Sequence, residues 1–398
     1  MAVAYRKRSI ENVVKKAARQ FPAVIVTGPR QSGKTTLLKH IFAKTHNYVS
    51  LDDPDMRLMA AQEPKLFLAN YPPPVIIDEI QYSPELFTYL KIEIDKKRSK
   101  KGQFLLTGSQ SFPLMAKVGE SLAGRVAVFK LLSFSYAEQF PGNDEPDIKS
   151  LKQMTLRGGF PELALNKRLD RKLWFSGYLQ TYLERDIRQV RQIGDLMDFQ
   201  RFLELLAANN GQVLHLSNLS NDLGVAVNTV KAWISVLEAC NQIILIKPFY
   251  KNKGKRIIKS PKIYFLDTGF LCYLLGIENK EQVFKGTLAG GLFENVVLGE
   301  LIRKFNNNGE LPRIFWWRTS YGDEVDFIIE RNGKISPVEV KMSSRINKVM
   351  TRGLSSFSLI FADEIKKAVL VNLADRKMSL GNKMECVPFK DMIKTGLW

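Results

Sequence analysis

Two carboxylates and a lysine lie close together in residues 324–341, which read EVDFIIERNGKISPVEVK. The Asn-Gly pair inside this stretch predicts a tight hairpin turn between two short strands. Because side chains alternate along a strand, Glu339 and Lys341 share one face, and Asp326 at the start of the facing strand can meet them. Two carboxylates can hold Mg²⁺ on a phosphodiester, while a lysine stabilises charge or positions water. The stretch is therefore a candidate site for metal-dependent phosphodiester chemistry.

A second motif lies near the other end of the chain, where residues 21–38 read FPAVIVTGPRQSGKTTLL. A short apolar run, a glycine-rich turn and a helix-like pattern follow one another, and the turn fits GxxxxGK[ST]. In such a loop backbone N–H groups surround the phosphates, the lysine neutralises their charge and the hydroxyl after it binds Mg²⁺. We therefore predict ATP and Mg²⁺ as cofactors, with the nucleotide held by Gly28, Pro29, Arg30, Gln31, Ser32, Gly33, Lys34, Thr35 and Thr36.

Two acids end the next apolar run, PPPVIIDEI (72–80). A buried parallel strand has a continuous apolar sequence, and its carboxyl end lies at the edge where α/β sheets bind ligands. We expect Asp78 to bind Mg²⁺ together with Thr35, and to complete the nucleotide site. We expect Glu79 to orient or deprotonate the attacking water.

Two further polar residues adjoin later strands of the predicted sheet. QFLLTGSQ (103–110) ends in hydroxyl and amide side chains, of which we favour Ser109 as the group that senses the γ-phosphate or positions water. Arg125 directly precedes the apolar run VAVFKLL (126–132). An arginine in this place can project into the nucleotide of a neighbouring subunit and stabilise transition-state charge. The alternative is an ordinary surface arginine.

Seven segments distributed along the chain support a resemblance to a known family: VIVTGPRQSGKTT, YVSLDDPD, IIDEIQYSPEL, LLTGSQS, LAGRVAVFKLLSFSYAEQF, GGFPE and YLERDIRQV. Together they resemble the prokaryotic AAA+-type ATPases whose core is followed by a carboxy-terminal domain of unknown function. The resemblance covers essentially the whole chain. It implies a parallel-sheet ATPase core, a nuclease-like fold at the far end, and a homo-oligomer, by resemblance a hexamer, in which Arg125 of one subunit meets the ATP of the next.

The middle of the chain separates into two helical patterns. The polar break PGNDEPDIKS (141–150) ends the core, and aromatic residues at helical spacing follow it in a predicted lid. The candidates in this part for a second phosphate-sensing arginine are Arg157, Arg185 and Arg188, and the sequence does not choose among them.

From residue 199 the pattern is that of a winged helix-turn-helix. LSNLSNDLGV and AVNTVKAWISVLEAC predict two helices around a turn at Gly224, and two apolar strands flank the basic loop KNKGKR. Such a module reads DNA or, alternatively, serves as a lid or subunit contact. Its DNA-binding candidates are Asn228, Thr229 and Lys231 on the second helix, and Lys251, Lys253, Lys255 and Arg256 in the wing.

The composition favours a polyanionic partner. Among 398 residues, Lys and Arg number 59 against 40 Asp and Glu, which leaves a net charge of +19. This excess points first to DNA, although a merely solvated basic surface is the alternative. The three cysteines are widely spaced and indicate neither a disulfide framework nor a zinc site. With no 18-residue apolar window and no signal-like amino terminus, we expect a cytoplasmic protein without a membrane partner.

The carboxy-terminal stretch resembles the PD-(D/E)xK nuclease superfamily, with Asp326, Glu339 and Lys341 at its signature positions. The resemblance also implies Glu294, on the preceding helix, as an extra acid. The implied metal ligands are Glu294, Asp326 and Glu339. A nuclease-like fold can keep these acids without cleaving, so activity and its absence both stay open.

The sequence as a whole predicts an α/β protein of four parts: a P-loop AAA+-type ATPase core (1–143), a helical lid (144–198), a winged helix-turn-helix (199–280) and a restriction-endonuclease-like α/β domain (281–398). We expect a Mg²⁺-dependent oligomeric ATPase that binds DNA, branched or broken, and carries a metal-dependent nuclease-like domain. Two alternatives are an ATP-switched DNA-binding regulator and a signalling ATPase that acts on protein.

Overall fold

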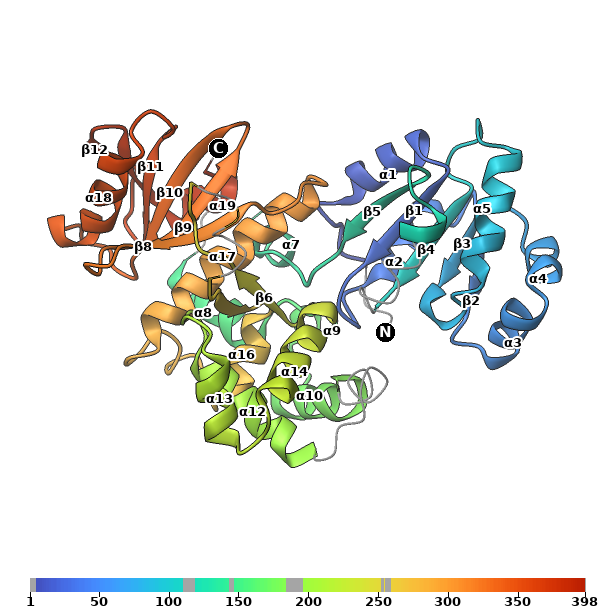
Figure 1. Ribbon diagram of the computed structural model, residues 1–398, viewed down its shortest axis with the longest axis horizontal. Helices are drawn as coiled ribbons and strands as arrows, with labels where there is room; N and C mark the ends of the chain where they lie inside the picture. The colour runs from blue at the N-terminus through green and yellow to red at the C-terminus, as the bar shows by residue number, and fades with distance from the viewer. Residues whose placement is uncertain are drawn as a thin grey trace.

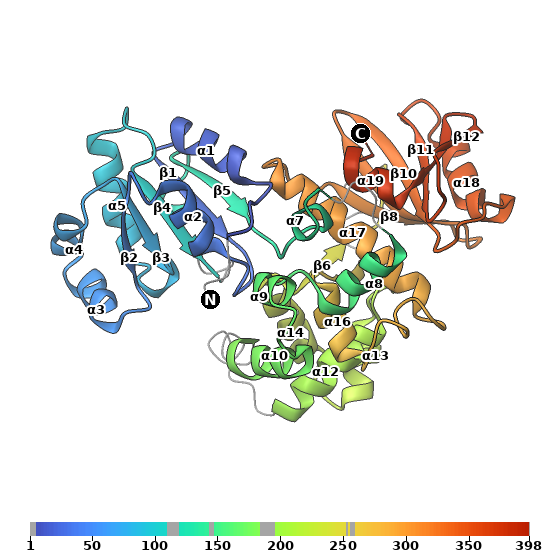
Figure 2. The same cartoon turned by 180° about the vertical axis from the view of Figure 1, so that it is seen from behind.

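The computed structural model describes residues 5–109, 119–142, 147–183, 196–251, 254 and 259–397. Within them the chain forms a parallel-sheet domain at one end, a mixed-sheet domain at the other and a helical module that adjoins both (Figure 1, and from behind in Figure 2). No helix in these ranges is long and apolar enough to span a membrane.

The first domain is built on five parallel strands in the order β2-β3-β4-β1-β5. Three central strands are buried along their whole length, as expected for apolar runs covered by helices on both faces. The carboxyl ends of β1, β3 and β4 therefore meet at one edge. The strands are β1 (Ala23–Thr27), β2 (Asn47–Ser50), β3 (Val75–Asp78), β4 (Phe104–Gly108) and β5 (Val126–Lys130), and the helices α1 (Glu11–Gln20), α2 (Lys34–Phe42), α3 (Pro54–Gln62), α4 (Pro64–Asn70) and α5 (Leu86–Lys96).

The helical module contains both the lid and the helix pair of the predicted winged helix. The pair turns at Gly224, whose φ of 70° is left-handed, and an antiparallel strand pair follows it, as predicted. The short helix α7 (Tyr136–Gln139) ends the predicted core, and the predicted lid, 144–198, contains α8 (Ile148–Arg157), α9 (Pro161–Leu165), α10 (Arg171–Tyr178) and a π-helical turn (Leu179–Leu183). The others are α12 (Leu196–Ala208), α13 (Leu216–Leu223), α14 (Val227–Ala239), β6 (Ile243–Ile246), β7 (Lys262–Phe265) and α16 (Thr268–Leu274).

The last domain is a mixed six-stranded sheet in the order β12-β13-β11-β10-β9-β8, entered from the long helix α17 (Ala289–Asn307). Its predicted hairpin is confirmed: β9 and β10 pair around Asn332 and Gly333, whose positive φ values of 51° and 73° suit a type I′ turn. The other elements are β8 (Ile314–Arg318), β9 (Glu324–Arg331), β10 (Lys334–Val340), α18 (Arg352–Ile360), β11 (Ala368–Asn372), β12 (Met378–Gly381), β13 (Met384–Pro388) and α19 (Phe389–Thr395).

The apolar cores join some of these parts and separate others. One buried cluster runs from Leu132 to Leu397 and combines lid helices, the α13–α14 pair, α17 and one face of the last sheet. Two separate buried clusters, both within the first domain, cover the two faces of its sheet. The lid and the winged-helix elements therefore share one core, whereas the first domain has cores of its own.

Candidate nucleotide site and carboxylate cluster

The phosphate-binding motif forms the turn between β1 and α2. Gly28 has φ +145°, and a Cβ there would lie only 2.0 Å from the backbone oxygen of Leu131, so no side chain fits. Gly33, with φ +90°, is the residue before the first turn of α2. These two glycines let the loop curl over the start of the helix, where helix N–H groups favour a phosphate.

The loop side chains fit a phosphate ligand. Lys34 is buried, and its Nζ donates to the carbonyl oxygens of Gly28 (3.1 Å) and Pro29 (2.9 Å). The hydroxyl of Ser32 is buried and has no hydrogen-bond partner among the described residues. An ammonium group at carbonyl oxygens and an unpaired hydroxyl beside it are groups that phosphate oxygens would satisfy.

Asp78 lies against the hydroxyl predicted to share its Mg²⁺ ion. Thr35 Oγ1 donates to Asp78 Oδ1 at 2.7 Å, and the hydroxyl of Thr107 donates to the same carboxylate oxygen. Tyr48 Oη donates to Asp78 Oδ2 at 3.1 Å. Thr35 and Asp78 are thus the hard oxygen ligands that Mg²⁺ prefers, already side by side, while Tyr48 is a contact that the motif spacing did not indicate.

Glu79 is held in a constrained position next to Asp78. Its backbone is left-handed, with φ +54°, and its N–H donates to Thr107 Oγ1 at 3.0 Å. Ser109 Oγ donates to Glu79 Oε2 at 2.7 Å, and Gln81 donates to the same oxygen. Burial alone would raise the pKa of Glu79, but Lys34 and these hydrogen bonds outweigh it and hold the pKa below its usual value. Glu79 is therefore ionised at neutral pH.

Arg125 lies at the opposite edge of the sheet from the P-loop of its own chain. Its carbonyl accepts from the N–H of Ala23, the first residue of β1, whereas the loop follows Thr27, the last. The guanidinium forms a two-pronged ion pair with Asp95, at 2.7 and 2.9 Å. Arg125 is therefore not placed to reach the phosphate loop of its own chain.

A cavity of about 240 Å³ adjoins the loop on the side of the lid. Tyr5 in its wall stacks on the ring of His40, with 3.6 Å between the ring centroids. The other wall comes from α9 of the lid. The lining residues are Tyr5, Arg6, Arg8, Gly33, Thr36, Phe134, Pro161, Glu162 and Leu165.

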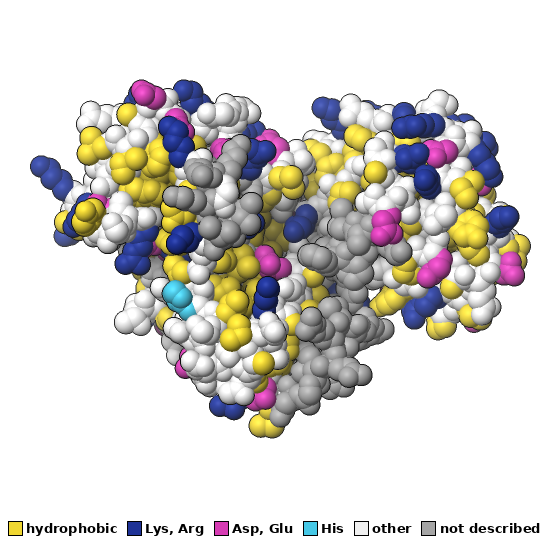
Figure 3. Space-filling view, in the orientation of Figure 1, with side chains coloured by type: hydrophobic (Ala, Val, Ile, Leu, Met, Phe, Trp, Pro, Cys, Tyr) yellow, Lys and Arg dark blue, Asp and Glu magenta, His cyan; other side chains and the backbone are white. Residues whose placement is uncertain are grey.

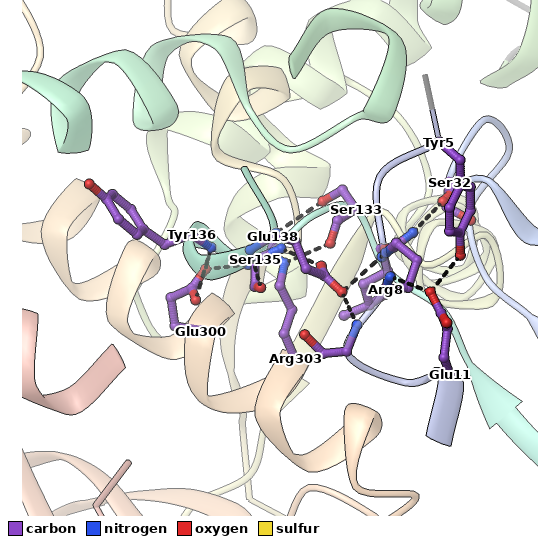
Figure 4. A network of polar contacts seen from close by, with 12 residues as sticks. Tyr5, Arg8, Glu11, Ser32, Ser133, Ser135, Tyr136, Glu138, Glu300 and Arg303 are labelled. Carbon is purple, nitrogen blue, oxygen red and sulfur yellow. Dashed lines mark hydrogen bonds and ion pairs between the residues drawn. The ribbon is translucent and has the colours of Figure 1, made fainter. Parts of the chain in front are cut away.

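Arg8 ties the loop to the segment after β5 (Figure 4). It is 4% exposed, and its guanidinium donates to the carbonyl oxygens of Ser32 (2.8 Å) and Leu132 (2.7 Å) and to Glu138 Oε1 (3.1 Å). The carboxylate of Glu138 also accepts from the N–H of Ser9 and of Ser135. Sequence reasoning missed Arg8, because one arginine in a basic amino-terminal stretch carries no signal of burial.

Helix α17 also forms hydrogen bonds to the segment after β5 (Figure 4). Glu300 accepts from the N–H of Tyr136 at 3.1 Å. Arg303 donates to the carbonyl oxygens of Ser133 (3.0 Å) and Leu266 (2.9 Å). The connection between the loop and the long helix is thus made of buried, hydrogen-bonded charges.

The carboxy-terminal hairpin brings its two acids together. Asp326 and Glu339 are both buried; Asp326 Oδ2 accepts from the N–H of Val340 at 2.7 Å, and Lys341 pairs with Glu339 Oε1. Burial, followed by the charge of Asp326, raises the pKa of Glu339 to about 8. The second oxygen, Oε2, is buried without a partner among the described residues. An unpaired carboxylate oxygen beside a second carboxylate fits a divalent cation.

Glu294, the third predicted ligand, lies nearby but is engaged by β7. Tyr264 donates its hydroxyl to Glu294, and Lys262 Nζ lies 3.9 Å from it while pairing with Glu324. Over the ranges that the structure describes, no group of three or more His, Cys, Asp or Glu is arranged to hold a metal ion. Glu294 nevertheless interacts electrostatically with Asp326, and its charge contributes to the raised pKa of Glu339, so the three predicted acids lie in one cluster in which Asp326 and Glu339 are candidate cation ligands.

The predicted DNA contacts are described only in part. Asn228 and Lys231 are exposed near the start of α14, and Thr229 is half-buried. Lys251 is exposed and pairs with Glu364 at 3.1 Å. Lys253, Lys255 and Arg256 lie outside the described residues.

Of the three candidate second phosphate sensors, the structure describes only Arg157. Arg157 directs its guanidinium to the carbonyl oxygens of Leu163, Asn166 and Leu169, which gives it a structural role in the lid. Arg185 and Arg188, like Gln110 after β4, lie outside the described residues.

Comparison with family models agrees with this geometry: residues 20–140 match the model described as AAA domain. The chain carries an AAA P-loop ATPase domain. Residues 148–281 match a domain of unknown function (DUF8612), which spans both the predicted lid and the winged helix. Residues 289–392 match a second one (DUF4143), which contains the carboxylate cluster.

Similar proteins match this chain over most of their own length. An uncharacterized protein of Mycobacterium tuberculosis is 29% identical over 386 residues, 96% of this chain and 83% of that protein. An uncharacterized protein of Methanocaldococcus jannaschii is 26% identical over 86% of this chain and 81% of its own length.

Two solved structures are similar at low identity. A Walker-type ATPase of Pyrococcus abyssi has a TM-score of 0.46 at 15% identity and covers 68% of this chain and 95% of its own. The Holliday junction branch migration motor RuvB of Thermotoga maritima has a TM-score of 0.30 at 17% identity, and the match covers 59% of this chain and 86% of that protein. At these TM-scores neither likeness carries an argument about function.

Proposed function

We propose that this protein is a Mg²⁺-dependent ATPase that works as a homo-oligomer on DNA. The observation that supports the ATPase most directly is the convergence of Lys34, the Thr35–Asp78 pair and an ionised Glu79 at one sheet edge. These are the groups that phosphoryl transfer to water needs: a cation for the phosphates, metal ligands and a proton acceptor.

We assign each of these residues a role in ATP hydrolysis. Lys34 exchanges its carbonyl partners for phosphate oxygens, and Thr35 and Asp78 would hold Mg²⁺, which would supply neutralising charge to the phosphates. Glu79 accepts a hydrogen bond and then the proton of the attacking water, while Ser109 fixes its orientation. The cavity at Tyr5 and Phe134 takes the adenine, since it adjoins the loop and offers aromatic and apolar walls.

Arg125 serves the nucleotide of the neighbouring subunit. Arg125→Ala alone and Glu79→Gln alone should each lose ATP turnover, but a mixture of the two should recover part of it, because an intact Arg125 then faces an intact Glu79. Steady-state phosphate release measures this. Arg98→Ala, which changes an exposed arginine, should leave turnover unchanged. If ATP turnover does not recover in well-mixed oligomers, Arg125 does not act on the neighbouring nucleotide, and its role is limited to the ion pair with Asp95.

DNA is the proposed partner because charge and exposure favour it. The chain carries +19, and Asn228 and Lys231 present donors near the start of α14. Figure 3 shows Lys and Arg side chains spread over both ends of the visible face instead of gathering in one patch. We therefore expect salt-dependent binding over an extended surface, with branched or broken DNA as the substrate.

The two carboxylates of the hairpin are proposed to support DNA cleavage. We expect labelled linear, forked, four-way-junction or single-stranded DNA to be cut with Mg²⁺ or Mn²⁺, and Asp326→Ala to lower the rate by about 10²-fold or more, because even indirect partners of metal ligands are worth 10- to 100-fold. Asp363→Ala removes an exposed acid of the same domain and should cut normally. Cleavage that survives in Asp326→Ala would assign the activity elsewhere.

A second candidate is an ATP-switched DNA-binding regulator that does not cleave. The engagement of Glu294 by Lys262 and Tyr264 favours it, since that acid is then not available to a metal. Tight, salt-sensitive binding without cleavage, with or without ATP, would select this function. Binding that is absent or insensitive to salt would instead point to a signalling ATPase that acts on protein.

A further inference from the structure

A basic loop of sequence KKRSKKG (96–102) leads from the end of α5 into β4 and belongs to neither of the sites described above. Five of its seven residues are Lys or Arg, and it contains no acid and no large apolar side chain. Strand β4 runs parallel to β1, and the P-loop follows the carboxyl end of β1. The loop before β4 therefore lies at the opposite, amino edge of the sheet, away from the nucleotide site.

The loop has a fixed conformation. Gln103 is buried, and its side-chain amide donates to the carbonyl oxygens of Lys97 (3.1 Å) and Lys100 (3.2 Å). The N–H of Lys100 also donates to the carbonyl oxygen of Lys97, at 2.9 Å. The basic side chains thus project from a backbone that is already ordered, which lowers the entropic cost of binding a partner.

Two neighbouring segments bring further cations to the same edge. The N–H of Gly102 donates to the carbonyl oxygen of Phe21, directly after α1, at 2.9 Å. The carbonyl oxygen of Gly102 lies 2.8 Å from Nε2 of His46, in the segment after α2. Arg19 and Lys44 each lie two residues before one of these contacts. The amino-edge cluster comprises the exposed residues Arg19, Lys44, Lys97, Arg98, Lys100 and Lys101.

The acids of α5 do not neutralise this cluster. Glu93 pairs with Lys96 at 2.6 Å. The hydrogen bonds of Arg125 lower the pKa of Asp95 most and the charge of Arg98 lowers it further, but both carboxylate oxygens are engaged by Arg125. Among the residues that the structure describes, no carboxylate lies within ion-pair distance of any of the six cations. Like charges gathered on one edge repel one another, and a polyanionic partner relieves that repulsion.

The chemistry of the loop favours DNA as this polyanion. Duplex DNA carries one negative charge per about 1.7 Å of its axis, and Lys and Arg contact its phosphates without reading bases. Basic segments that bind a membrane surface instead combine their cations with large apolar side chains on an amphipathic helix. Residues 96–102 contain no such side chain.

We propose that the amino-edge cluster binds the phosphate backbone of DNA independently of base sequence, which rests on the proposed function of the protein as an ATPase acting on DNA. Because the cluster lies opposite the nucleotide edge, DNA and ATP can be bound at the same time. Arg125 precedes β5, the outermost strand of this sheet, and is not part of the cluster.

The salt dependence of DNA binding tests the cluster. Fluorescence anisotropy of a labelled duplex of arbitrary sequence is measured at several salt concentrations with the full-length protein and with Lys97→Gln/Lys100→Gln/Lys101→Gln. We expect the slope of log Kd against log salt to fall by about 2.7 and the affinity at about 100 mM salt to fall at least about tenfold. ATP turnover without DNA should be unchanged, which shows that the variant is folded.

A matched variant removes the same charge elsewhere. Lys167→Gln/Lys285→Gln/Lys383→Gln changes three exposed lysines outside the cluster and should alter the slope by less than about 1. If the wild type binds DNA and both triple variants keep its slope, the proposed surface is wrong while DNA remains the partner. If the wild type binds vesicles containing phosphatidylserine but no DNA, or binds neither, the partner and the surface are both wrong.

Chemical modification tests the same surface without substitutions. Lysines are acetylated in the wild-type protein with and without saturating duplex, and the modified positions are read by mass spectrometry. Lys97, Lys100 and Lys101 should react several-fold more slowly when DNA is bound, because phosphates cover their amines, whereas Lys383 should keep its rate. Equal rates at Lys97, Lys100 and Lys101 with and without bound DNA would contradict the proposal.

Discussion

Replacing Glu79 by Gln should lower ATP turnover by about 10²- to 10⁴-fold while ATP still binds, the range expected for loss of a general base. The amide keeps an oxygen for the hydrogen bond from Ser109, so the loop geometry should persist. Without its charge the side chain can no longer take a proton from water. Steady-state phosphate release and fluorescent-nucleotide titration measure the two effects separately.

Two further variants locate the effect in the nucleotide site. Glu85→Gln neutralises an exposed glutamate six residues later and should hydrolyse ATP normally. Lys34→Ala should abolish binding itself, because the ammonium at the loop carbonyls is the cation nearest the phosphates. Normal turnover by Glu79→Gln or Lys34→Ala would contradict the assignment of this edge as the catalytic site.

Replacing Arg8 by Met should destabilise the protein by about 3–5 kcal/mol, the usual cost of breaking a buried ion pair from one side. Glu138 would stay buried without its guanidinium partner, and the carbonyls of Ser32 and Leu132 would lose their donors. Urea unfolding measures the free energy. Because Ser32 belongs to the phosphate loop, nucleotide affinity should fall in the same variant.

The loss of stability in Arg8→Met should depend on pH, because Glu138 contributes to the pair only in its ionised form. Burial tends to raise the pKa of this carboxyl, but Arg8 and the N–H groups of Ser9 and Ser135 outweigh it and hold the pKa below its usual 4.5. The pair therefore stabilises the native state fully above pH 4.5, and the contribution is lost as pH falls through the native pKa. The difference in the free energy of unfolding between wild type and Arg8→Met should therefore become smaller as the pH is lowered.

Matched variants separate the ion pair from general damage. Lys7→Met changes the exposed neighbouring cation and should be close to neutral. Arg8→Met with Glu138→Gln removes both charges and should recover part of the lost stability, as double replacements of buried pairs do. If the double variant is as unstable as the sum of the single ones, Arg8 and Glu138 do not interact energetically.

Local sequence determined the parts of this protein whose chemistry lies within one turn or one hairpin. The spacing from Gly28 to Thr35 specifies a phosphate loop because covalent geometry places those groups around one point. Asp78 and Glu79 follow from the same logic, since an apolar strand must end where its first polar side chains emerge. The Asn332–Gly333 turn likewise sets the hairpin register that brings Asp326 and Glu339 together.

Tertiary packing decided which distant charges meet. Arg8 and Glu138 are separated by 130 residues and become partners only because the segment before α1 and helix α7 meet beside the phosphate loop. Lys262 and Tyr264 reach Glu294 because β7 lies against α17. No spacing rule connects such residues, because long side chains pair with whichever opposite charge the domain packing buries beside them.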